Sequence, residues 1–305
     1  MTAASTARII EVTEFVDGEY FAHVESALAK STVDGYRKMW AAHREQFTGR
    51  DLEMRTCDAQ SLMRTICTEN PHLNKTTLRH LKNFYSGIWA HALRMGQCDR
   101  ENPWRAVQIP QAPEPGETYA YSPADVTLML AKLAEPYSLL VLLAACTGLR
   151  KSEIRGLRWS DFDPATSTLS VNRAVWRAHI KTTKSAASKA PVPVVPVLAA
   201  KLDQYKSRVP HGDKCFMFPN GSGGPLDLDN VARRFIAPQV GGIWRGWHAF
   251  RRGLATFLHA QNVADKEIQA ILRHENVAIT QKSYIKTVPE NVRAAMATIT
   301  FGEVV

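Results

Sequence analysis

Apolar side chains recur at helical spacing through the first hundred residues of the chain. One series falls within residues 31–47, and a longer one falls within residues 78–92. Such spacing places the apolar groups on one face of a helix. Asp58 is expected to cap a shorter helix between the two series. The pattern predicts an N-terminal segment over residues 1–29, followed by a small helical bundle over residues 30–112.

The helical pattern breaks in a stretch that is rich in proline. Prolines at 103, 110, 113 and 115 exclude a continuous helix, so a linker is expected over residues 113–120. After the linker, Ser122 followed by Pro123 has the form of an N-cap with proline at the first helical position. Apolar helices are predicted to follow over residues 123–146.

Residues 167–197 change to an extended pattern. Apolar residues alternate with polar ones and prolines, which predicts a hairpin or short meander at a sheet edge, where a missing N–H is tolerated. Helical spacing returns from Trp247 onward. The second domain, residues 121–305 with a C-terminal tail, is therefore expected to be mostly helical. The predicted fold class is mostly α with a small antiparallel β-sheet.

Composition places the chain among ordinary globular proteins. Of 305 residues, 45% are apolar and 22% charged, which suits two packed domains. The longest strongly apolar run, residues 139–146, is well short of the roughly 18 residues that cross a bilayer, and the N-terminus lacks a signal-peptide apolar core. A cytoplasmic protein is expected. Five scattered cysteines, with no CxxC pair, argue against a disulfide framework and a zinc finger.

Positive charge is concentrated in the second part of the chain. The net charge is +9, and residues 113–305 carry +8 of it. This asymmetry favours a polyanionic partner, although many basic proteins bind no nucleic acid.

Two clusters of candidate reactive groups lie in this basic part. Arg150 follows a glycine turn; by itself it would simply pair with Glu153, three residues on. His248 and Arg251 are three apart on a predicted helix, so they project to one side and repel each other unless an anion joins them. A phenol such as Tyr284, with a pKa of about 10, attacks a phosphorus atom only with cations and a proton acceptor nearby.

Taken together, these segments resemble the tyrosine recombinases, the family of phage integrases and Xer-type resolvases. ACTGLRKSEIRGLRWSDFD (145–163) looks like the first arginine box of the family. HAFRRGLATFLHAQNVADKEIQAILRHENVAITQKSYIK (248–286) looks like the second, and weaker similarity covers residues 30–110. The resemblance implies an N-terminal core DNA-binding domain and a C-terminal catalytic domain.

The resemblance also implies roles for the reactive groups. Arg150 and Arg251 would bind the scissile phosphate, and Tyr284 would attack it to leave a 3′-phosphotyrosine and a free 5′-hydroxyl. His248, as the general base, and His274 would hydrogen-bond the phosphate and transfer protons, while Glu153 would orient the cluster.

The resemblance further implies a lysine on a β-hairpin that protonates the leaving 5′-oxygen. Lys184 fits the family spacing best, with Lys181 as second choice. Two departures from the family pattern, Arg252 after HxxR and Arg273 in place of glycine before His274, add positive charge. Expected DNA contacts are Lys181, Arg252, Arg273 and, on the outer side of the long N-terminal helix, Lys75, Arg79 and Lys82, for which a solvated face is the equal alternative.

The function implied is a bacterial or phage-encoded site-specific recombinase, or integrase, that needs no metal or ATP. It would be a monomer or weak dimer when free and a homotetramer on paired sites of double-stranded DNA, with accessory DNA-bending or directionality factors. Two alternatives stay open: a DNA-binding factor without catalysis, and a type IB topoisomerase that relaxes supercoils as a monomer.

Overall fold

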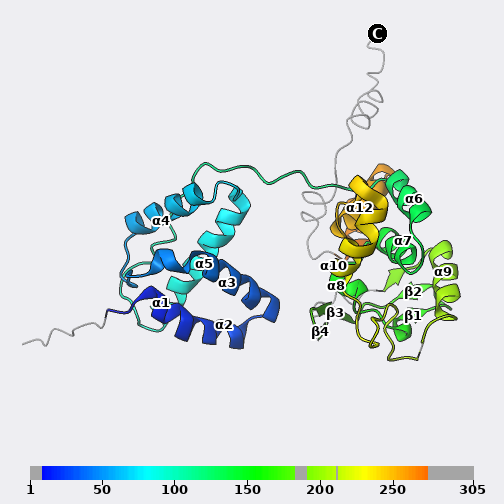
Figure 1. Ribbon diagram of the computed structural model, residues 1–305, viewed down its shortest axis with the longest axis horizontal. Helices are drawn as coiled ribbons and strands as arrows, with labels where there is room; N and C mark the ends of the chain where they lie inside the picture. Colours follow the sequence, from blue (N-terminus) through cyan, green and yellow to red (C-terminus); the bar gives the residue numbers. More distant parts are fainter. Residues whose placement is uncertain (1–8, 183–190, 211, 274–305) are drawn as a thin grey trace, which may run out of the picture. The chain divides into compact units, whose positions relative to one another are not determined.

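The computed structural model describes residues 9–182, 191–210 and 212–273 of the chain. It divides into two compact units, Met1–Glu117 and Thr118–Val305. The helices of each unit gather around its own apolar core, and the two groups of helices are drawn in Figure 1. Most of the described chain is helical and the strands are antiparallel, which confirms the predicted fold class. None of the helices built from the described residues has the length and apolar character that a membrane span needs.

The N-terminal unit is a bundle of helices around a core rich in aromatic side chains. Its long helix α5 supplies eight of the buried side chains, and Asn74 caps α5 by accepting the Thr77 N–H at 2.9 Å. The elements are α1 (Val12–Phe15), the π-helix η1 (Val16–Tyr20), α2 (Phe21–Ala27), α3 (Lys30–His43), the 3₁₀-helix η2 (Arg44–Phe47), α4 (Thr56–Glu69) and α5 (Lys75–Arg94).

Two details of this unit differ from the sequence prediction. Apolar residues of α1, η1 and α2 are buried in the same core as α5, so the compact unit begins well before the predicted boundary at residue 30. Asp58 lies in the first turn of α4 rather than before it, and its carboxylate accepts the N–H of Arg55 at 3.1 Å. A carboxylate satisfies an orphan N–H equally well from that position.

The C-terminal unit surrounds the buried helix α7 (Tyr137–Thr147), which contacts α6 (Pro123–Lys132), α9 (Pro196–Lys206) and α12 (His248–Ala260). Ser122 caps α6 and Asp125 completes the capping box, which confirms the predicted helix start. The remaining helical elements are α8 (Lys151–Ile154), η3 (Trp159–Asp161), α10 (Leu228–Val231), η5 (Ala232–Ile236), α11 (Ala237–Val240), η6 (Gly241–Ile243) and α13 (Asp265–Leu272).

The strands of this unit form two small antiparallel sheets. The first has the order β1 (Phe162–Asp163), β2 (Thr168–Leu169), β5 (Val192–Pro193). Pro193 lies on the edge strand β5, as expected for a residue that cannot donate to a ladder. The second sheet pairs β3 (Arg173–Trp176) with β4 (His179–Thr182), and β3 contacts α8.

Candidate active site

Arg150 is held at the turn between α7 and α8. The turn depends on Gly148, which ends α7 in the left-handed conformation with φ of 59°. Arg150 is extended and precedes α8; its N–H donates to Glu153 Oε2 at 2.8 Å and its Nη1 donates to Oε1 at 3.0 Å. The pairing expected for an isolated arginine is therefore present, and the Arg150 side chain still keeps 37% of its surface exposed.

Arg251 is buried within α12, and no pattern in the sequence indicates that this charge lies inside the unit. Only 1% of the residue is exposed. Its Nη1 donates to the carbonyl of Gly148 at 2.7 Å, and its Nη2 donates to the carbonyl of Leu272. Both carbonyls lie at helix C-termini, where partial negative charge collects. The planar guanidinium thus joins the ends of α7 and α13.

Gly148 also allows these elements to approach closely. A Cβ at this position would lie 2.7 Å from Leu272 Cδ2 and 3.1 Å from Leu254 Cδ2. The positive φ and the lack of space both favour glycine here. The turn that carries Arg150 is consequently in direct contact with α12 and α13.

His248 begins α12 and lies within the field of the same arginines. The pKa of His248 is lowered. Desolvation by the surrounding protein atoms is the largest cause, and the charges of four cations lower the pKa further: Arg252, Arg251, Arg150 and Lys151. The residue as a whole is exposed, but the four positive charges act in the same direction as desolvation. His248 is therefore neutral at pH 7. His248 and Arg251 lie three residues apart on α12, and Arg251 donates to the carbonyl of Gly148, two residues before Arg150, so the structure brings the three predicted groups together.

Arg273 was predicted as a DNA contact, and the structure places its side chain elsewhere. The side chain is 2% exposed, and its Nη2 donates to Glu153 Oε2 at 2.7 Å. Glu153, predicted to orient the cluster, thus has a second partner 120 positions away that no local pattern in the sequence indicates. A buried guanidinium that is paired with a carboxylate is not presented to DNA, so we correct the role of Arg273.

Other predicted cations lie nearer the surface. Arg252 is half-buried, and its Nε donates to the carbonyl of Tyr119 at 2.6 Å. Lys181 lies on β4 opposite Ala174 of β3, so the second-choice lysine is on a β-hairpin. Lys184, His274 and Tyr284 lie outside the described residues.

The three cations predicted on α5 differ in their surroundings. Lys75 pairs with Glu114, and Lys82 Nζ donates to the carbonyls of Arg105 at 3.1 Å and Val107 at 2.6 Å. Lys82 therefore supports the chain that follows the bundle. Arg79 is exposed on the helix surface.

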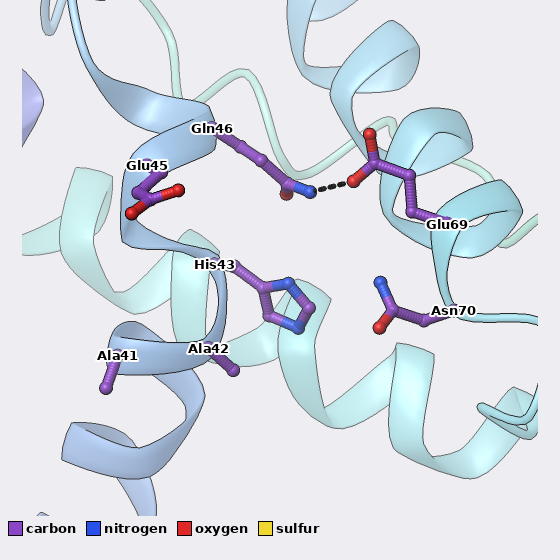
Figure 2. A pocket seen from close by; sticks show the side chains of 7 residues that line it. All are labelled: Ala41, Ala42, His43, Glu45, Gln46, Glu69 and Asn70. Atoms are coloured by element: carbon purple, nitrogen blue, oxygen red, sulfur yellow. Dashed lines mark hydrogen bonds between the residues drawn. The ribbon is translucent and has the colours of Figure 1, made fainter.

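A polar cavity of about 560 Å³ lies in the N-terminal unit between the end of α3, η2 and the end of α4 (Figure 2). Gln46 donates to Glu69 at 2.5 Å, and the ring of His43 points toward Asn70. Burial lowers the pKa of His43, and the charge of Glu69 opposes this shift. Glu45 adds a second carboxylate. None of the predicted site residues lines this cavity, and two carboxylates make it unsuited to a phosphate.

An apolar groove of about 530 Å³ lies in the C-terminal unit along α6, α7, β5, α12 and α13. Phe257 of α12 is 43% exposed and lines this groove.

Within residues 9–182, 191–210 and 212–273, no three His, Cys, Asp or Glu side chains are close enough together to hold a metal ion.

Comparison with known proteins gives one family and a consistent fold. The model of the phage integrase family matches residues 123–290. The chain is 27% identical over 256 residues to a tyrosine recombinase XerC-like protein of Caldanaerobacter subterraneus, covering 73% of this chain. It is 25% identical over 263 residues to an integrase of Streptomyces ambofaciens and 26% identical over 286 residues to the integrase of Mycobacterium phage D29. These two matches cover 77% and 85% of this chain.

The chain spans just under two thirds of the first two relatives, 65% and 66% of their lengths, and 75% of the phage protein. Among solved structures, it is similar to the Tn1549 transposon integrase in complex with a circular intermediate DNA, with a TM-score of 0.77 and 17% identity over 95% of this chain and 100% of the other. A lambda integrase tetramer bound to a Holliday junction has a TM-score of 0.68 and 16% identity over 97% and 81% of the two chains.

Proposed function

We propose that this chain, which belongs to the phage integrase family, breaks and rejoins DNA at specific sites through a 3′-phosphotyrosyl intermediate. The observation that supports this most is the convergence of Arg150, Arg251 and His248, which come from two segments about a hundred positions apart. Several fixed positive charges around one neutral histidine suit an anion that gains charge during reaction.

Arg150 and Arg251 would bind the non-bridging oxygens of the scissile phosphate. Arginine stays charged and presents a planar fork that fits phosphate oxygens. Arg251 is oriented before DNA arrives, because its Nη1 and Nη2 are anchored to helix-end carbonyls. Preorganised donors stabilise a transition state without a reorganisation cost.

Tyr284 is the proposed nucleophile. Its oxygen would form a bond to phosphorus as the bond to the 5′-oxygen breaks, and Lys184 would give the leaving oxygen a proton. His248, neutral at pH 7 because of its lowered pKa, would accept the phenol proton. His274 would hydrogen-bond the phosphate. The phosphotyrosine conserves the energy of the phosphodiester bond, so resealing needs neither metal nor nucleotide.

We further propose that four copies act on two paired duplexes in the cytoplasm, with accessory proteins setting direction. The solved relatives support this, because the lambda integrase was captured as a tetramer on a Holliday junction and the Tn1549 integrase on a circular DNA intermediate. The exposed Arg79 on α5 would contact phosphates from the N-terminal unit.

A pool of nicked duplexes with a randomised core tests the proposal. The nick lets the short cleaved strand diffuse away, which traps the covalent complex in denaturing gels. We expect wild-type protein, but not Tyr284→Phe, to form adducts and to enrich inverted repeats. Binding without adducts would favour the DNA-binding factor, and relaxation of any supercoiled plasmid by the monomer would favour the topoisomerase.

A further inference from the structure

Arg273 ends α13 in an unfavourable backbone conformation. Its φ of 56° and ψ of 48° lie in the left-handed region, which costs a residue with a side chain about 1–2 kcal/mol relative to the right-handed form. The residue is nevertheless 3% exposed and lies beside the Leu272 carbonyl that binds Arg251. A favourable contact of the Arg273 side chain is expected to offset this backbone cost.

That contact is the carboxylate of Glu153. Oε2 accepts both Arg273 Nη2, at 2.7 Å, and the N–H of Arg150, at 2.8 Å. Oε1 accepts Arg150 Nη1 at 3.0 Å. The Glu153 side chain is only 5% exposed, so one buried carboxylate holds both the backbone and the guanidinium of Arg150 while Arg273 holds the carboxylate.

The charge of Arg273 helps to keep this carboxylate ionised. Burial raises the pKa of Glu153, and the charge of Arg273 is the largest influence that lowers it, ahead of the hydrogen bonds and charge of Arg150. The net pKa is below the ordinary value. If Glu153 were protonated, its acceptor oxygens would bind Arg150 less strongly.

We infer that Arg273 is a positioning residue for the reaction: through Glu153 it fixes the Arg150 guanidinium in the orientation that meets the scissile phosphate. The inference rests on the proposed function, because it takes Arg150 as a phosphate ligand. It replaces the DNA contact predicted for Arg273 and extends the site to the end of α13.

Three substitutions at residue 273 separate charge from backbone strain. Arg273→Lys keeps the charge and the strained backbone. Arg273→Met keeps the strain and the approximate length but removes the charge. Arg273→Gly removes the charge and relieves the strain, so it yields folded protein even if the Met variant does not. Thermal unfolding at pH 8 reports whether each variant is folded.

The measurement is the rate of covalent adduct formation between pH 4 and 8.5, on a nicked duplex enriched from the randomised pool. Glu153 acts while ionised, so the rate is lost as pH falls through its pKa. We expect the rates of Arg273→Met and Arg273→Gly to begin to fall at a higher pH than the wild-type rate, so that each variant's rate relative to wild type is several-fold lower at the acid end than at pH 8. Arg273→Lys should stay close to wild type.

A purely structural role would lower the rate by the same factor at every pH. The cations that lower the pKa of His248 are Arg252, Arg251, Arg150 and Lys151, whereas the charge of Arg273 acts directly on Glu153. A second readout needs no DNA. The melting temperature of Arg273→Met should begin to fall at a higher pH than that of Arg273→Lys.

Two results would overturn the inference. One is a wild-type pH profile in the Met and Gly variants, and the other is equal impairment of the Lys and Met variants at every pH. If wild-type protein forms adducts, either result removes only the role of Arg273. If it forms none, the proposed function fails, and the orientation of Arg150 for a phosphate fails with it.

Discussion

Replacing Arg251 by lysine tests whether the buried guanidinium holds the site together before DNA binds. Lysine keeps the charge, but its single ammonium cannot reproduce the fork that reaches the carbonyls of Gly148 and Leu272. Losing one hydrogen bond to a charged group costs about 2 kcal/mol. For a unit of this size, that loss lowers the melting temperature by about 4–8 °C.

Scanning calorimetry measures the loss, and hydrogen exchange locates it at the ends of α7 and α13. The matched control is Arg252→Lys, one residue along the same helix, where the half-buried side chain donates to one carbonyl. We expect the control to melt within about 2 °C of wild type. Equal melting of Arg251→Lys and wild type, with unchanged exchange at both helix ends, would refute this account of Arg251.

Three further predictions concern other parts of the chain. Burial lowers the pKa of His43 and of His91, so the stability of the folded protein should fall as pH drops below about 6.5. With glutamine at both positions, the melting temperature should depend less on pH between pH 7 and 5. Gly148→Ala should destabilise the protein by about 2 kcal/mol in denaturant unfolding, because the left-handed φ and the contact at 2.7 Å both penalise a Cβ. Arg79→Ala should weaken DNA binding and lower its salt dependence in fluorescence anisotropy, whereas Lys82→Met should mainly lower stability.

Each of these has a clear contrary result. If the melting temperature of the double glutamine variant falls with pH as steeply as that of wild type, the two histidines are not the cause of the acid sensitivity. Wild-type unfolding of Gly148→Ala would mean that the turn tolerates a side chain. Equal loss of DNA affinity at residues 79 and 82 would return Lys82 to the DNA surface.

The parts of the fold that the sequence predicted are those governed by local rules. Ser122 and Pro123 fix the start of α6, and the proline of β5 marks an edge strand, because both effects act within a few residues. The sequence prediction placed Asp58 at the N-cap of α4, but Asp58 lies about one turn inside the helix. A carboxylate can accept an unpaired N–H at the helix start from either position.

The site was predictable only in part. The HxxR spacing indicated that His248 and Arg251 share one side of α12, but no local pattern shows that Arg251 reaches the ends of two other helices. The pairing of Arg273 with Glu153 likewise depends on how α13 meets the turn after α7. Such contacts arise from packing between segments, which periodicity along one segment does not encode.

The most direct test of the central claim is to identify the residue that carries the phosphate. Covalent complexes from the nicked duplex pool would be digested with nuclease and protease, and the nucleotide-linked peptide sequenced by mass spectrometry. We predict a phosphodiester on Tyr284 joined to a 3′-terminal nucleotide, and no such peptide from Tyr284→Phe. A nucleotide attached to any other side chain, or an adduct that persists in Tyr284→Phe, would contradict the account.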